Sequence, residues 1–193
     1  MWRIRPAVPG DEHVIPQLAI PFRERISPYV LNPTQVRAYL DEWLVAEAPQ
    51  EEIKWLEPVD PHIVSREEES PYCIGGSIHY VTSHYTKWTR NRAYLIHMKL
   101  VPEDLVDEFG KTAGAFLSQL TCPGRGSLRV LVNHLKGMFP ELWSWLSISN
   151  ASLVSFYERE LGLRFEDRVY TFMNTYKGDW SNYKLGRWKR QDS

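Results

Sequence analysis

The sequence predicts a mixed α/β (α+β) fold, in which helices and strands build one core. Apolar residues recur at helical spacing in some segments, as at Val36, Tyr39 and Leu40, whereas other segments are short apolar runs bounded by glycine or proline. With 193 residues, of which 43% are hydrophobic and 24% charged, the chain is long enough to bury a core. We expect one domain over residues 1–176 and a basic, aromatic C-terminal tail over residues 177–193.

The first half of the chain alternates between helical and strand patterns. Residues 2–7 predict a strand, and Asp11 is placed to cap a helix over about 12–26. Asn32 is a second cap, followed by Pro33 in a first turn, and residues 34–48 carry apolar side chains on one helical face. Residues 49–61 hold three prolines and predict a loop, after which strands are expected at 62–68, 71–85 and 91–101.

The second half predicts alternating helices and strands as well. A short helix is expected at 102–111, and residues 112–120 fit either a strand or a buried helix. A helix from Ser127 to about Phe139, a strand at 142–149, a helix at 151–161 ending near Gly162 and a strand at 168–176 complete the order.

The charge is close to balanced overall but is unevenly distributed. The net charge of −1 argues against a general nucleic-acid-binding protein. Residues 41–69 nevertheless contain ten acidic residues against Lys54 and Arg66. This segment forms either a solvated face or, where it borders a cleft, a surface that attracts a cationic substrate.

Cysteine and histidine give no sign of a disulfide framework or a metal site. Cys73 and Cys122 are too few for the first, and the spacing of His79 and His84 puts them on opposite faces of a strand. The chain shows no signal pattern and no long apolar run. We therefore expect no metal, no membrane and a cytoplasmic location.

The stretch "CPGRGSLRVLVNHL" places Gly124 and Gly126 directly before an amphipathic helix. Ser127 alone would cap that helix. Two glycines separated by one residue also clear side chains from the backbone amides, and exposed amides at a helix N-terminus bind phosphate and other anions. Arg125 adds a cation at the same place.

From residue 121 to 173 the order of glycine turn, helix, strand, Asn, helix and strand resembles the GNAT superfamily of acyl-CoA-dependent N-acyltransferases. This resemblance implies a central, mostly antiparallel, twisted sheet that is splayed at the cofactor site, with helices on both faces. It also implies acetyl-CoA as cofactor. The family's pyrophosphate loop matches "TCPGRG", although Thr121 stands where the family usually has Gln or Arg. The cofactor-binding residues implied are Leu120, Thr121, Gly124, Arg125, Gly126, Ser127 and Asn150.

The same resemblance implies a catalytic tyrosine. Family members place an aromatic–Tyr pair seven residues after the Asn, as Phe156-Tyr157 follows Asn150 here. The family's tyrosine commonly protonates the departing CoA thiolate, which makes Tyr157 the expected general acid for transfer to a small-molecule or protein amine. The glutamate that often serves as base has no counterpart in residues 112–120, and His97 and Glu108 are substitutes.

A second class of function stays open. Small GNAT-like proteins occur among the internal virion proteins of tailed phages, and residues 142–157 are similar to segments there. Such a protein would keep the fold without the reaction and would be located in the virion. Residues 177–191 interleave five basic residues with Trp180, Tyr183 and Trp188, which suits either docking to nucleic acid or an acidic partner, or packing on the domain.

Overall fold

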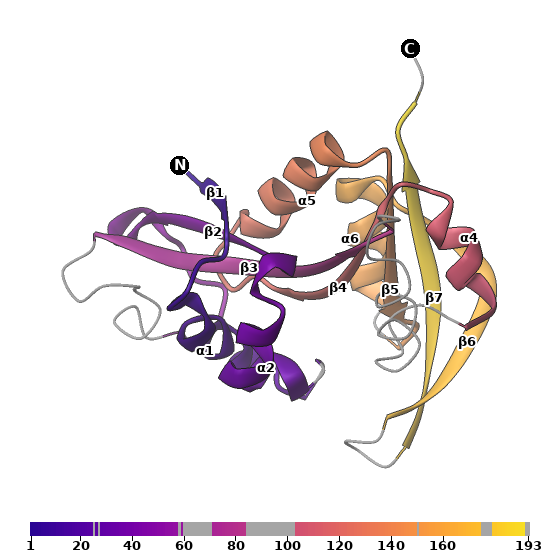
Figure 1. The fold of residues 1–193 in the computed structure, drawn as a ribbon, viewed down its shortest axis with the longest axis horizontal. Coiled ribbons are helices and arrows are strands. Elements are labelled where there is room, and N and C mark those ends of the chain that lie inside the picture. Colours follow the sequence, from indigo (N-terminus) through magenta and orange to yellow (C-terminus); the bar gives the residue numbers. More distant parts are fainter. Residues whose placement is uncertain are drawn as a thin grey trace. The chain divides into compact units, whose positions relative to one another are not determined.

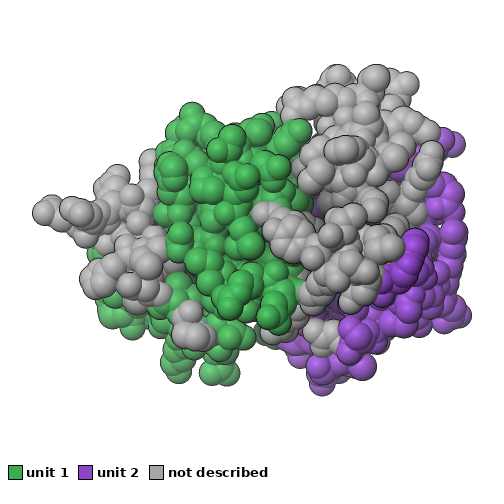
Figure 2. Space-filling view, turned by 90° about the horizontal axis from the view of Figure 1, so that it is seen from below, with its two compact units in different colours: residues 1–80, 119–134 green, residues 81–118, 135–193 purple. Residues whose placement is uncertain are grey.

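The computed structural model of the chain describes residues 1–24, 26, 28–57, 59, 71–83, 103–149, 151–174 and 179–191. They belong to two compact units, one of residues 1–80 and 119–134 (unit 1) and one of residues 81–118 and 135–193 (unit 2). Figure 2 shows the atoms of the two units in different colours. The strands expected at 62–68 and 91–101 lie outside the described residues.

Unit 1 contains three antiparallel strands, β1 (Arg3–Pro6), β2 (Trp43–Pro49) and β3 (Tyr72–Thr82), the last of which ends in unit 2. Ile4 lies opposite Ala46, and Trp43 lies opposite His79. Its helices are η1 (Asp11–His13), α1 (Ile15–Ala19), η2 (Ile20–Phe22), η3 (Pro28–Leu31), α2 (Pro33–Ala38), η4 (Leu40–Glu42) and η5 (Gln50–Glu52). Helices α1 and α2 lie on one side of the strands, and the beginning of α5 (Ser127–Met138) lies on the other (Figure 1).

The prediction of one helix over residues 34–48 was wrong beyond its first turns. Helix α2 begins as expected, with the Asn32 side chain accepting a hydrogen bond from the Thr34 N–H at 3.0 Å, but it ends at Ala38. Residues 43–48 form β2 and are all buried. A strand buried on both faces has no alternation of apolar and polar residues, so periodicity does not separate it from a helix.

Unit 2 contains most of β4 (Ala115–Thr121), with β5 (Glu141–Ser147), β6 (Arg164–Asn174) and β7 (Asp179–Lys189). Strand β4 is parallel to β5 over Ala115–Leu117, and β7 is antiparallel to both β5 and β6. The helices are η7 (Glu103–Leu105), α4 (Val106–Gly110) and α6 (Ala151–Leu161), together with the end of α5. The buried cluster of unit 2 consists of Val81, Val106, Phe109, Phe116, Trp143, Tyr170 and Leu185.

These elements confirm the mixed α+β class with mostly antiparallel strands, since β4 with β5 is the one parallel pairing described within the units. The segment expected as a C-terminal tail is different: residues 179–189 form β7. Leu185 on β7 is fully buried. Three of the basic residues (Lys184, Arg187 and Lys189) and the aromatic residues Trp180, Tyr183 and Trp188 therefore belong to a strand of the fold.

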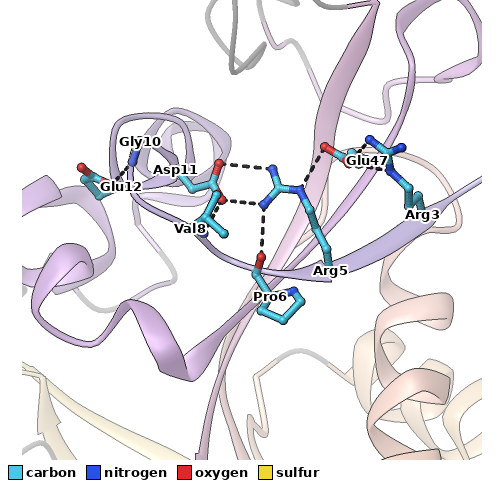
Figure 3. Close-up of polar contacts among 8 residues, drawn as sticks. All are labelled: Arg3, Arg5, Pro6, Val8, Gly10, Asp11, Glu12 and Glu47. Carbon is cyan, nitrogen blue, oxygen red and sulfur yellow. Dashed lines mark hydrogen bonds and ion pairs between the residues drawn. The ribbon is translucent and has the colours of Figure 1, made fainter.

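Strand β1 is fixed by buried ion pairs (Figure 3). The Arg5 guanidinium contacts both carboxylate oxygens of Asp11, at 2.7 and 3.3 Å, and its Nε lies 3.2 Å from Glu47 on β2. Asp11 is fully buried and also accepts the Val8 N–H at 2.8 Å. Burial alone would lower the pKa of Arg5, but Asp11 and Glu47 raise it above its ordinary value. The network ties β1 to η1 and to β2.

We predict that Asp11→Asn destabilises the protein by about 3 kcal/mol, because it removes the fully buried one of the two carboxylates that pair with the Arg5 guanidinium. Asp167→Asn, at an exposed position on β6, is the matched control and should change the free energy of unfolding by less than about 0.5 kcal/mol. Urea unfolding of both variants measures the difference. Equal stability of the two variants would contradict a structural role for the Arg5–Asp11 pair.

Candidate functional site

Glycine occupies two positions of the turn between β4 and α5, and the structural reason differs between them. Gly126 has a φ of +84°, a conformation that favours glycine, and a Cβ there would meet only Trp2 Nε1, at 3.5 Å. Gly124 is needed for close packing, because a Cβ there would lie 2.8 Å from the Gly75 carbonyl oxygen and 2.7 Å from the Trp2 ring. Gly124 therefore allows the turn to pack closely against Gly75 and Trp2, and Gly126 allows the backbone conformation directly before α5.

Several amides of the turn already have acceptors within unit 1. The Gly124 N–H donates to the carbonyl of Gly75 on β3 at 2.7 Å, and the Arg125 N–H donates to the Lys54 carbonyl at 2.8 Å. The Leu56 N–H donates in return to the Pro123 carbonyl at 2.8 Å. The turn is thus held between β3 on one side and residues 54–56 on the other.

The open end of α5 begins one residue further on. The Val130 N–H donates to the Gly126 carbonyl at 3.3 Å, as an α-helix requires. The amides of Gly126 and Leu128 precede that bond, at the helix end where helix geometry supplies no acceptor. Arg125 is exposed beside them. An anion at this end would meet two backbone N–H groups, one guanidinium and the positive end of the helix dipole.

The remaining side chains of the turn point inward. Ser127 is fully buried, and its hydroxyl lies 2.7 Å from the Gly124 carbonyl oxygen, while its N–H donates to the same carbonyl at 3.1 Å. Thr121 is also buried, with its hydroxyl 2.6 Å from that of Ser77. Both residues therefore brace the turn. Leu120, at the end of β4, is half-buried.

The thiol of Cys122 is held in the protonated form. Burial raises the pKa of its thiol to about 12, although the Ser127 hydroxyl and the Ser77 backbone lower it in part. A nucleophilic cysteine needs the thiolate form, which such a pKa suppresses near neutral pH. The chemistry of this turn is therefore that of its backbone and of Arg125.

Tyr157 lies in unit 2, on the second turn of α6, and is buried. Its ring is edge-on to that of Phe156 at 6.2 Å, and its carbonyl accepts the Leu163 N–H at 3.3 Å. Asn150 lies outside the described residues, although α6 begins at the next residue, Ala151. The helix that carries the expected acid is thus formed as the sequence indicates.

The two candidates for the base fare differently. Glu108, on α4, accepts a hydrogen bond from Arg187 Nη1 at 2.8 Å, so its carboxylate is already paired. His97 lies outside the described residues.

Sequence reasoning missed a hydrogen-bonded chain of three side chains in unit 1. The His79 ring is fully buried, with Nδ1 at 2.7 Å from the Tyr29 hydroxyl and Nε2 at 3.0 Å from Glu42 Oε1. The partners are 50 and 37 residues away in the sequence, so no local motif announces them. A histidine within a buried apolar strand was the one available signal.

Among the described residues, no group of three or more His, Cys, Asp or Glu side chains is placed to hold a metal ion. In the same part of the chain, no helix combines the length and apolar character needed to cross a membrane.

No family model matches the sequence, and no curated protein matches it. Solved structures do match. The chain is 14% identical to Arabidopsis thaliana NAA60 in complex with a bisubstrate analogue, with a TM-score of 0.61 and 100% of both chains covered. It is 12% identical to yncA from Salmonella typhimurium with its cofactor acetyl-CoA (TM-score 0.57; 100% and 95% covered). A GNAT-family acetyltransferase from Bacillus cereus also aligns (12% identity; TM-score 0.52; 100% and 99% covered). The chain has the fold of the GNAT acetyltransferases.

We predict that Gly126→Val weakens binding of CoA at least about tenfold while the protein stays folded, because the side chain disfavours the φ that opens the turn. Gly137→Ala on the same helix is the control, since a Cβ at Gly137 meets nothing within 4 Å. Calorimetric titration with CoA compares the two variants with the parent. Unchanged affinity in Gly126→Val would make the turn a helix entrance and nothing more.

Proposed function

We propose that this protein is an N-acetyltransferase that transfers the acetyl group of acetyl-CoA to a primary amine by direct attack. The observation that carries the proposal is the N-terminus of α5, where the Gly126 and Leu128 amides and the Arg125 side chain could bind an anion. The fold supports it, because NAA60 and yncA, which share that fold, were solved with acetyl-CoA.

Some residues of the turn would contact the cofactor, and others would hold the turn in its conformation. Gly126 and Leu128 would hold the pyrophosphate by their amides, and Arg125 would add a charge-assisted contact. Gly124, Ser127 and Thr121 would keep the turn in place through the internal bonds described above. Asn150 and Leu120 are the further cofactor contacts that the resemblance implies.

Direct transfer needs a proton donor for the leaving group. When bound, acetyl-CoA supplies the acetyl group as an activated thioester. The phenol of Tyr157 would give its proton to the sulfur as negative charge develops there, since a phenol with a pKa of about 10 is otherwise a weaker acid than a thiol with a pKa of about 8.5. Direct attack proceeds without an acyl-enzyme, and the raised pKa of Cys122 disfavours the thiolate that would be needed to form one there.

The negative charge of the acidic segment, residues 41–69, indicates which class of amine the protein would accept. Four acidic residues of this segment lie on η4 and η5, namely Asp41, Glu42, Glu51 and Glu52. Glu57 follows η5 by five residues. A concentration of negative charge attracts cations and raises their local concentration. An amine that arrives as an ammonium ion, such as a lysine side chain or a polyamine, is the acceptor we propose.

We predict that Tyr157→Phe keeps the fold and the affinity for acetyl-CoA but lowers turnover with spermidine about 10²-fold or more, because it keeps the ring and removes the hydroxyl group that donates the proton. Tyr170→Phe, a change at another buried tyrosine of unit 2, should leave turnover unchanged. Release of free thiol reports the rate. Equal rates in the parent and Tyr157→Phe would assign the proton to another group, whereas no turnover in either would favour a protein that keeps the fold without the reaction.

A further inference from the structure

A short antiparallel bridge joins the acidic segment to the glycine turn within unit 1. Trp55 pairs with Gly124 in this bridge. Beside that pair, the Arg125 N–H donates to the Lys54 carbonyl at 2.8 Å. The bridge therefore places Lys54 opposite Arg125, the exposed cation of the turn.

The register of the bridge brings two positive charges together. Residues directly opposite each other on antiparallel strands lie on the same face, with Cβ atoms about 5 Å apart. Lys54 and Arg125 occupy such positions, and both are exposed. Within the described part of the chain, neither side chain has an acidic partner. The two cations are thus neighbours that solvent and an anion can reach.

Lys54 is also an exception in the composition of its segment. Residues 41–57 contain six acidic residues and no other basic one. The single lysine stands where this segment meets the glycine turn, at a position where a second positive charge is unfavourable because like charges directly opposite each other repel. An anion bound at both side chains would turn this repulsion into two attractive contacts.

Coenzyme A carries a group that suits this pair. Besides its pyrophosphate it has a phosphomonoester on the 3′ oxygen of its ribose, and a phosphomonoester bears about 1.5 to 2 negative charges at pH 7. With the pyrophosphate at the Gly126 amide and Arg125, the 3′-phosphate lies one ribose ring away, which matches the neighbouring position of Lys54. The lysine ammonium is a compact charge that contacts a phosphate from any direction.

We propose that Lys54, beside Arg125, binds the 3′-phosphate of CoA and makes the site selective for CoA over dephospho-CoA. Lys54 is then a specificity-determining residue for the cofactor, and it takes no part in the chemistry at the thioester. The inference rests on the proposed function, because it requires the glycine turn to bind the pyrophosphate.

The test uses two ligands, CoA and dephospho-CoA, which differ only in the 3′-phosphate. In calorimetric titrations the parent should bind CoA about tenfold more tightly than dephospho-CoA, the effect of one charge-assisted contact. Lys54→Gln should reduce this preference to less than about threefold and change the Kd for dephospho-CoA by less than about twofold. Lys54→Arg, which keeps the charge, should retain most of the preference.

Arg23→Gln is the matched control, because it removes an exposed positive charge elsewhere in unit 1 and should leave the preference unchanged. The thermal midpoint of free Lys54→Gln should equal or exceed that of the parent, since a like-charge repulsion is removed.

Two outcomes would overturn the role of Lys54 and leave the cofactor site standing. One is a parent that binds both ligands equally well, and the other is an equal loss of affinity for both ligands in Lys54→Gln. The second outcome would assign Lys54 to the pyrophosphate or, with a lowered thermal midpoint, to the support of the turn. A parent that binds neither ligand would overturn this inference and the proposed function together.

Discussion

The close approach of Gly124 to Gly75 is the contact on which the candidate site depends. The N–H of one lies 2.7 Å from the carbonyl oxygen of the other, and a Cβ on Gly75 would sit in the Trp2 ring. Trp2 in turn donates from Nε1 to the Arg125 carbonyl at 3.3 Å. Strand β1, held by the Arg5–Asp11 ion pair, begins directly after Trp2, so the buried charges near the N-terminus help to set the position of the glycine turn.

This bracing changes how the turn is expected to work. In a glycine-rich turn all the backbone amides are usually expected to bind the phosphate. Here the amides of Gly124 and Arg125 donate instead to the carbonyls of Gly75 and Lys54. The amides that can bind a phosphate are therefore those of Gly126 and of the first turn of α5. A preformed anion-binding site of this kind loses little conformational entropy when the anion binds, because the backbone is already ordered. Backbone atoms thus provide the anion site, and side chains elsewhere are left for proton transfer.

Much of the fold was predictable because its elements are short and well punctuated. Helix α6 was expected at 151–161 and is found there, and the Asn32 cap and the β3 strand were also identified. Strand β2 was not, since its burial on both faces removes the alternation that marks a strand. The acceptor of the Gly124 amide and the partners of His79 lie 37 to 50 positions away in the sequence, and no local pattern encodes such pairings.

Amide hydrogen exchange of the glycine turn, followed by NMR with and without acetyl-CoA, shows directly whether this turn binds the cofactor. We expect slow exchange at Gly124 and Arg125 before any ligand is added, because their amides are bonded within the protein. The amides of Gly126 and Leu128 should exchange fast in the free protein and become protected when acetyl-CoA binds. Protection that is unchanged at Gly126 and Leu128 while acetyl-CoA binds elsewhere would contradict the assignment of this turn as the cofactor site.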